Sequence, residues 1–266
     1  MAVHMARWYS STQSLCYEIG LTGCLDEAQD TFVAENFQDS PSILAFWRNL
    51  KSIILRADLI RYLAILSQGG IYTDIDTSNT APIHEWIPED MRNREINAVV
   101  GIEYDDDTYK MFVRRIEFCQ WTLMAKPGHP IIKAVVQRVM DHLEYIARIK
   151  HTTLDQITLN KAEVLEATGP GAYSDAVLQV LRDQVGEYLE FESFSGMKEP
   201  TLYGDVLVLP INGFGFGQKH SHSGDPSYGR ALARHHFGRS WYKTKPDTSQ
   251  GKAKTQKKKN DPETKA

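Results

Sequence analysis

The chain has 266 residues, 42% of them hydrophobic, and a formal net charge of −4 at pH 7. This length can bury one sizeable core, and the acidic balance argues against nucleic acid as a partner, because phosphate contacts need clustered Lys and Arg. The three cysteines show no metal-binding spacing, no apolar run could span a bilayer, and the first residues lack a signal-peptide core, so the sequence as written predicts a soluble protein.

The first quarter of the chain is predicted to be mainly helical. Residues 1–50 have the character of helices and turns, and residues 51–68 carry apolar side chains at helical spacing. Gly69 stands where such a helix would stop. The next predicted element is a strand over residues 71–76.

The rest of the chain alternates between predicted strands and helices. Residues 96–104 form an apolar run that suits a buried strand, and residues 118–150 suggest a strand, a Pro-Gly turn and a long amphipathic helix. Residues 166–185 form a Gly-Pro loop that feeds another helix, which Ser174 or Asp175 could cap. This alternation predicts an α/β layered domain.

Two aspartates in the predicted strand are candidates for a metal site. Because side chains alternate along a strand, Tyr72, Asp74 and Asp76 would share one face, and the residues between them would pack on the core. Carboxylates about 7 Å apart along a strand can both approach one divalent cation. The alternative is a turn followed by a solvated edge strand.

The helix before this strand carries a charged pair. Asp58 and Arg61 are three residues apart and therefore share a helix face. Facing inward, the pair could hydrogen-bond a ligand rich in hydroxyl groups. Facing outward, it would be an ordinary surface ion pair.

These residues belong to a longer pattern. "RADLIRYLAILSQGGIYTDID" resembles the signature of DXD glycosyltransferases of the sugar-binding-region type. Further blocks, "VVGIEYDDD", "RRIEFCQWTLMAKPGHPI", "TGPGAYSD", "GDVLVLPINGF" and "HHFGRSW", resemble the fungal Och1-type family, the initiation-specific α-1,6-mannosyltransferases of glycosyltransferase family 32. The resemblance runs from about Phe32 to Trp241.

The resemblance implies a fold and a domain organisation. It implies a GT-A-like three-layer α/β sandwich around a mixed, mainly parallel sheet, with the catalytic domain over residues 31–243. Residues 1–30 form an atypical N-terminal segment, and residues 244–266 form a Lys-rich tail that is expected to be disordered. The membrane anchor, stem and first βα unit with which the family begins have no counterpart in residues 1–30, so the chain is expected to be truncated or to have lost part of its donor pocket.

The resemblance also assigns roles to individual residues. Asp58 and Arg61 would hold the hydroxyl groups of the donor sugar, and Tyr72 would lie against the nucleotide or the sugar. Asp74 and Asp76 would bind Mn²⁺ or Mg²⁺, which would grip the donor diphosphate. The late-chain metal ligand would be His236, with its neighbour His235 as the alternative.

The expected reaction is transfer of mannose from GDP-mannose to a mannosylated glycan acceptor with retention of the α configuration. It would form an α-1,6 linkage that initiates the outer chain of N-glycans, on the lumenal side of the Golgi membrane and within a membrane-bound transferase complex. Asp175 would contact acceptor or donor, unless it is a helix cap. Trp121 would contact the acceptor, unless it belongs to the core.

Two other functions stay open on the sequence. A transferase-like domain without its first βα unit could bind sugar nucleotides without catalysis. "DIDTS" could also serve a haloacid-dehalogenase-type phosphatase, with Asp74 as the nucleophile.

Overall fold

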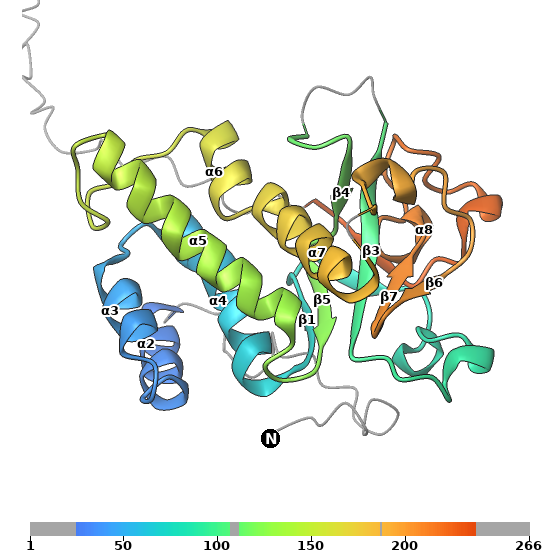
Figure 1. Ribbon diagram of the computed structural model, residues 1–266, viewed down its shortest axis with the longest axis horizontal. Coiled ribbons are helices and arrows are strands. Elements are labelled where there is room, and N and C mark those ends of the chain that lie inside the picture. Colours follow the sequence, from blue (N-terminus) through green and yellow to red (C-terminus); the bar gives the residue numbers. More distant parts are fainter. Residues whose placement is uncertain (1–24, 107–111, 187, 238–266) are drawn as a thin grey trace, which may run out of the picture. The chain divides into compact units, whose positions relative to one another are not determined.

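The computed structural model describes residues 25–106, 112–186 and 188–237 (Figure 1). The predictions for residues 1–24 and for the Lys-rich tail lie outside the described residues. The main helices are α2 (Leu25–Asn36), α3 (Pro41–Asn49), α4 (Ile53–Gln68), α5 (Pro130–Ile149), α6 (Lys161–Ala167), α7 (Pro170–Val185) and α8 (Ile211–Phe214). The strands are β1 (Gly70–Thr73), β2 (Thr77–Asn79), β3 (Ala98–Asp105), β4 (Ile116–Phe118), β5 (Thr122–Ala125), β6 (Thr201–Tyr203), β7 (Val206–Leu209) and β8 (Ala233–His235).

The strands form a large mixed sheet and a small one. The large sheet has the order β1-β5-β3-β7-β6, with β4 also paired to β3, and the small sheet pairs β2 with β8. The α/β class and the mixed sheet are therefore confirmed. The expectation of a mainly parallel sheet is wrong, because β3–β7 is parallel while the other described pairings are antiparallel. Parallel neighbours need a long crossover, whereas β4 and β5 follow β3, and β7 follows β6, with no helix among the described residues between them.

The central strands of the large sheet, β5, β3 and β7, are buried on both faces. Along β3, Ala98, Val100 and Ile102 pack into one hydrophobic cluster while Val99 packs into another, as the alternation of side chains along a strand requires. The first cluster includes residues of α4, α5 and α7, and the second includes Phe214 of α8. Helices therefore lie on both sides of the sheet, as the expected three-layer arrangement requires (Figure 1).

Helix α4 ends where the sequence predicts. Gly69 caps it with a φ of 63°, a conformation that favours glycine. A Cβ at this position would lie 2.4 Å from Cδ of Pro127, so glycine is also required by the close approach of the chain. The turn at Gly69 sends the chain directly into β1.

The prediction for the start of α7 is wrong. The helix begins at Pro170 with Gly169 as N-cap, so Ser174 and Asp175 both lie inside it. Proline suits the first helical turn because it has no N–H to leave unpaired, and the N-cap, Gly169, therefore lies five residues before Ser174 and six before Asp175. Among the described residues, no helix is long and apolar enough to cross a membrane.

Candidate metal centre

Asp74 and Asp76 lie in a turn between two sheets. Strand β1 ends at Thr73, and the backbone N–H of Thr77 donates to the carbonyl oxygen of Asp74 at 3.0 Å. The predicted strand over 71–76 is therefore too long, and Ile75 is 67% exposed where packing on the core was expected. The physical reason is that the chain leaves the large sheet after β1 and joins the small one at β2, which requires a change of direction.

The small sheet brings His235 to this turn. Thr77 of β2 is opposite His235 of β8. Nε2 of His235 lies 3.2 Å from Oδ1 of Asp76 and 3.8 Å from Oδ2 of Asp74. Asp74, Asp76 and His235 each offer one ligand atom, and these atoms all lie within 4.8 Å of one another.

This donor set fits a hard divalent cation. Ligand oxygens lie about 2.0–2.6 Å from Mg²⁺ or Ca²⁺, so two ligands of one ion are separated by no more than about twice that distance. Carboxylate oxygens are ligands that hard divalent ions favour, and an imidazole also binds first-row transition metals.

His236 faces elsewhere. Its Nε2 lies 2.7 Å from Oγ of Ser78, and its backbone N–H donates to the carbonyl oxygen of Asp76 at 2.8 Å. Successive side chains of an extended segment point to opposite faces, so only one of the two histidines can face the aspartates. The geometry therefore places His235, and not the expected His236, beside the two aspartates.

A buried charge network joins the turn to helix α4. Nη2 of Arg61 lies 2.9 Å from Oδ1 of Asp58, and Nη1 lies 3.5 Å from Oδ1 of Asp74. The hydroxyl of Tyr72 donates to the same oxygen of Asp74 at 2.8 Å, and the Arg61 guanidinium lies over the Tyr72 ring. Asp58 and Arg61 are both nearly inaccessible to solvent, so the alternative of a surface ion pair is wrong.

Burial and charge set the ionisation of these groups. Burial raises the pKa of Asp58, although Arg61 and a hydrogen bond from Thr168 oppose it. Burial also acts to raise the pKa of Asp74, but Arg61, His235 and Tyr72 outweigh it and the pKa lies below its ordinary value. Asp74 is therefore ionised at neutral pH, which is the state that binds a cation.

Comparison with known proteins shows which family this part of the chain resembles. Residues 5–92 match the family described as "Glycosyltransferase sugar-binding region containing DXD motif". Over this segment, the chain is similar to that glycosyltransferase family. The match covers Asp74 and Asp76, the two aspartates of the motif, and it begins inside the segment that the sequence sets apart as atypical.

Fungal relatives support the Och1-type resemblance. The initiation-specific α-1,6-mannosyltransferase of Schizosaccharomyces pombe is 38% identical over 81% of this chain, and that of Candida albicans is 33% identical over 81%. The putative glycosyltransferase HOC1 of Saccharomyces cerevisiae is 29% identical over 91%. The chain spans 54% of the first relative and 61% of each of the other two.

One solved structure also shows similarity. The PaToxG glycosyltransferase matches 60% of this chain and 55% of its own, with a TM-score of 0.35 and 18% identity. A TM-score this low carries no argument about the fold.

Trp121 supports the DXD turn from behind. It is 5% exposed, its carbonyl oxygen accepts the N–H of Asp74 at 2.9 Å, and its ring lies against His235 with a centroid distance of 5.0 Å. The structure therefore favours a place for Trp121 in the hydrophobic core over contact with an acceptor, since little of the ring is accessible. No pattern in the sequence predicted its contact with His235.

Thr168 is a site residue that the sequence did not single out. Its hydroxyl donates to Oδ2 of Asp58 at 2.7 Å, so the two oxygens of that carboxylate are held by Thr168 and Arg61. Thr168 is the first residue of "TGPGAYSD", one of the blocks that resemble the Och1-type family, but the resemblance assigned no role to this threonine. Locating its partner required the position of the α6–α7 junction beside α4.

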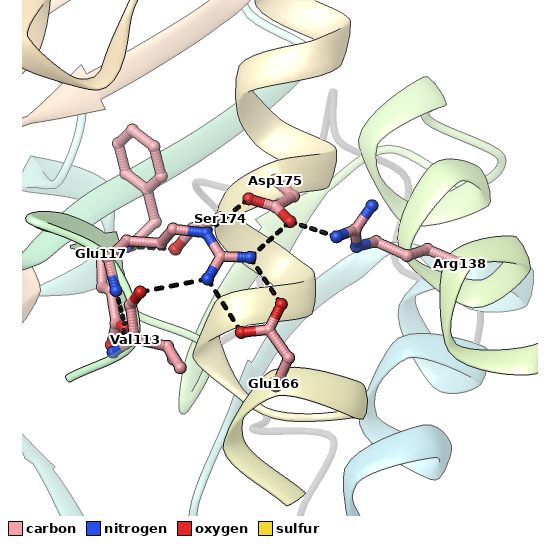
Figure 2. A network of polar contacts seen from close by, with 8 residues as sticks. Val113, Glu117, Arg138, Glu166, Ser174 and Asp175 are labelled. Carbon is pink, nitrogen blue, oxygen red and sulfur yellow. Dashed lines mark hydrogen bonds and ion pairs between the residues drawn. The ribbon is translucent and has the colours of Figure 1, made fainter. Parts of the chain in front are cut away.

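Asp175 lies in a different network, shown in Figure 2. Its carboxylate receives two hydrogen bonds from Arg114, at 2.9 and 2.7 Å, and one from Arg138. Arg114 also binds both carboxylate oxygens of Glu166. This network ties the segment before β4 to α5, α6 and α7, so the geometry favours a structural role over contact with a substrate.

We expect Asp175→Asn to lower the free energy of unfolding by about 2 kcal/mol, because Arg114 and Arg138 lose charge-assisted hydrogen bonds. We also expect it to leave Mn²⁺ affinity unchanged. Urea unfolding and a Mn²⁺ titration measure the two quantities. A stable variant with impaired glycan binding would instead support the acceptor role of Asp175.

The two histidines give a matched pair of variants. His235→Ala is expected to weaken Mn²⁺ binding by at least about 10-fold, because it removes one of three candidate ligands. His236→Ala removes the hydrogen bond to Ser78 and should change the affinity by less than about 2-fold. Electron paramagnetic resonance of free Mn²⁺ measures both, and the reverse order of effects would restore His236 as the ligand.

Proposed function

We propose that the chain transfers mannose from GDP-mannose to a mannosylated glycan, with a divalent metal ion and with retention of the α configuration. The observation that carries this proposal is the convergence of Asp74, Asp76 and His235 beside the buried pair Asp58–Arg61. The names of the fungal relatives support mannose as the sugar and α-1,6 as the linkage.

Different residues of the site would bind the metal ion and the donor sugar. Asp74, Asp76 and His235 would hold Mn²⁺ or Mg²⁺. When bound, the cation supplies positive charge to the diphosphate leaving group as the bond to the sugar breaks. Tyr72 orients the Asp74 carboxylate through its hydroxyl.

Asp58 and Arg61 are suited to bind the hydroxyl groups of the donor sugar. The Asp58 carboxylate and the Arg61 guanidinium are held by Thr168, Asp74 and each other, so they are oriented before the donor arrives. Orientation before binding reduces the entropy lost on binding, which favours a well-defined sugar position.

Release of GDP from GDP-mannose tests the proposal directly. We expect release to require Mn²⁺ or Mg²⁺, to stop in EDTA, and to increase with an oligomannose acceptor. UDP-glucose and UDP-galactose are the control donors, and linkage analysis of the product distinguishes α-1,6 from other bonds. Equal turnover of a UDP-sugar, or turnover in EDTA, would overturn the donor or the metal requirement.

A non-catalytic sugar-nucleotide-binding protein is the second candidate. The observation that favours it is that the candidate cation site beside the buried pair Asp58–Arg61 suits the binding of a sugar nucleotide whether or not transfer follows. It predicts Mn²⁺-dependent binding of GDP-mannose without release of GDP, which calorimetry and a turnover assay together would detect.

The phosphatase alternative has lost its support. The family match is to a glycosyltransferase, and Asp74 follows β1, an edge strand with partly exposed residues, rather than a wholly apolar strand.

The resemblance to Och1-type enzymes further supports a membrane-associated position in the Golgi lumen, within a transferase complex. Fractionation of cells that contain the tagged chain tests this location.

A further inference from the structure

A buried carboxyl group lies next to Trp121, behind the candidate metal centre. Glu103 of β3 is 7% exposed. Its Oε1 accepts a hydrogen bond from the indole N–H of Trp121 at 3.1 Å. An indole has a single hydrogen-bond donor, and a buried one needs a partner, so this contact fixes how the Trp121 ring is turned.

Trp121 touches both parts of the chain that carry metal ligands. Its ring lies against the His235 ring at a centroid distance of 5.0 Å and an interplanar angle of 57°. Its carbonyl oxygen holds the backbone N–H of Asp74. A rotation of the indole would therefore disturb the surface on which the His235 ring rests.

The charge state of Glu103 fits this arrangement. Burial raises its pKa to about 8, the nearby Glu117 carboxylate adds to the shift, and the hydrogen bond from Trp121 opposes it. At neutral pH the group is mainly protonated, so it can accept from the indole without placing another negative charge behind the two aspartates.

We propose that Glu103 is a positioning residue of the metal centre: by holding the Trp121 indole, it fixes the orientation of His235 and thereby sets the affinity for the cation. This inference rests on the proposed metal site at Asp74, Asp76 and His235. Residues behind metal ligands commonly change affinity by about 10- to 100-fold when they are replaced.

Four variants of the full chain test the role of Glu103. Glu103→Gln keeps an oxygen that accepts from the indole and has the shape of a protonated glutamic acid, so Mn²⁺ affinity should stay within about 2-fold of wild type. Glu103→Leu removes the acceptor and should weaken binding by about 10-fold. Trp121→Phe keeps a ring but has no N–H, and we expect a similar loss. In the Trp121→Phe background, Glu103→Leu should cause no further loss, because the two residues act through one hydrogen bond.

Electron paramagnetic resonance of free Mn²⁺, measured without donor, gives each dissociation constant. Asp175→Asn is the control, since Asp175 is a partly buried carboxylate that bonds to Arg114 and Arg138 in a separate network. Melting temperatures report folding separately, and a purely structural role for Glu103 would lower them without changing the affinity.

The results separate this inference from the proposed function. Wild-type binding that is lost in Asp76→Ala but unchanged in Glu103→Leu overturns the role of Glu103 alone. Fully additive losses in the double variant also overturn it. A wild-type chain that binds no Mn²⁺ overturns the metal site, and the role of Glu103 with it.

Discussion

Replacing Asp76 with alanine is expected to lower the metal-dependent release of GDP from GDP-mannose by at least about 100-fold. Asp76 offers one of three candidate ligand atoms, and its carbonyl oxygen accepts the N–H of His236, so the backbone of the turn should persist when the side chain is removed. The loss should therefore arise from cation binding and not from unfolding.

Thermal unfolding separates these two causes. Without metal, Asp76→Ala should melt within a few degrees of wild type, because it removes one of two adjacent like charges. Saturating Mn²⁺ should raise the melting temperature of wild type and leave that of the variant unchanged. Asp90→Ala, an exposed acid in the 3₁₀ helix Glu89–Met91, is the control for the change in net charge. An active Asp76→Ala variant would remove this residue from the site.

Replacing Arg61 with methionine is expected to lower the free energy of unfolding by about 3–5 kcal/mol at pH 7. The guanidinium lies between the carboxylates of Asp58 and Asp74, and all three side chains are largely buried. Methionine has a similar length and no charge, so the variant would leave two buried carboxylates without their principal cation. The same change should abolish donor binding.

The pH dependence gives a second test of Arg61. In wild type the pKa of Asp74 is below its ordinary value, so its stabilising contribution is present above the unfolded-state pKa of 3.8 and is lost as the pH falls through the folded-state value. Without Arg61, burial raises the pKa of both carboxyl groups, and the folded state then takes up protons as the pH falls. The loss in free energy of unfolding caused by Arg61→Met should therefore be smaller at pH 5 than at pH 7.

Urea unfolding at both pH values measures this loss. Arg138→Met is the matched control, because Arg138 also binds an aspartate but is 38% exposed, and it should cost about 1 kcal/mol or less. A loss below about 1 kcal/mol for Arg61→Met, or a loss that does not change with pH, would contradict the network described for this site.

Local features of the sequence predicted much of the helical part of the site. The spacing of apolar residues in 51–68 and the glycine at position 69 were sufficient to locate α4 and its end. The same helix fixed Asp58 and Arg61 on one face. Whether that face points into the protein or towards solvent depends on tertiary packing. Helix α4 packs against β1, and the α6–α7 junction brings Thr168 to Asp58, so the face points inward.

The metal centre shows where local reasoning fails. A period-two pattern predicted a strand through Asp76, yet the chain turns after Thr73 because β1 and β2 belong to different sheets. The choice between His235 and His236 depends on the register of β2 against β8, which no local spacing specifies.

The sequence by itself determined the α/β class, helix α4 with its glycine stop, and the aspartates of the DXD motif, because each depends on residues that are neighbours along the chain. Only the tertiary structure decided that His235 joins those aspartates, that Asp175 pairs with Arg114, and that Glu103 lies behind Trp121. Each of these contacts joins segments distant in the sequence, so each is set by strand pairing and by packing across the sheet, and a pattern within one segment carries no information about them.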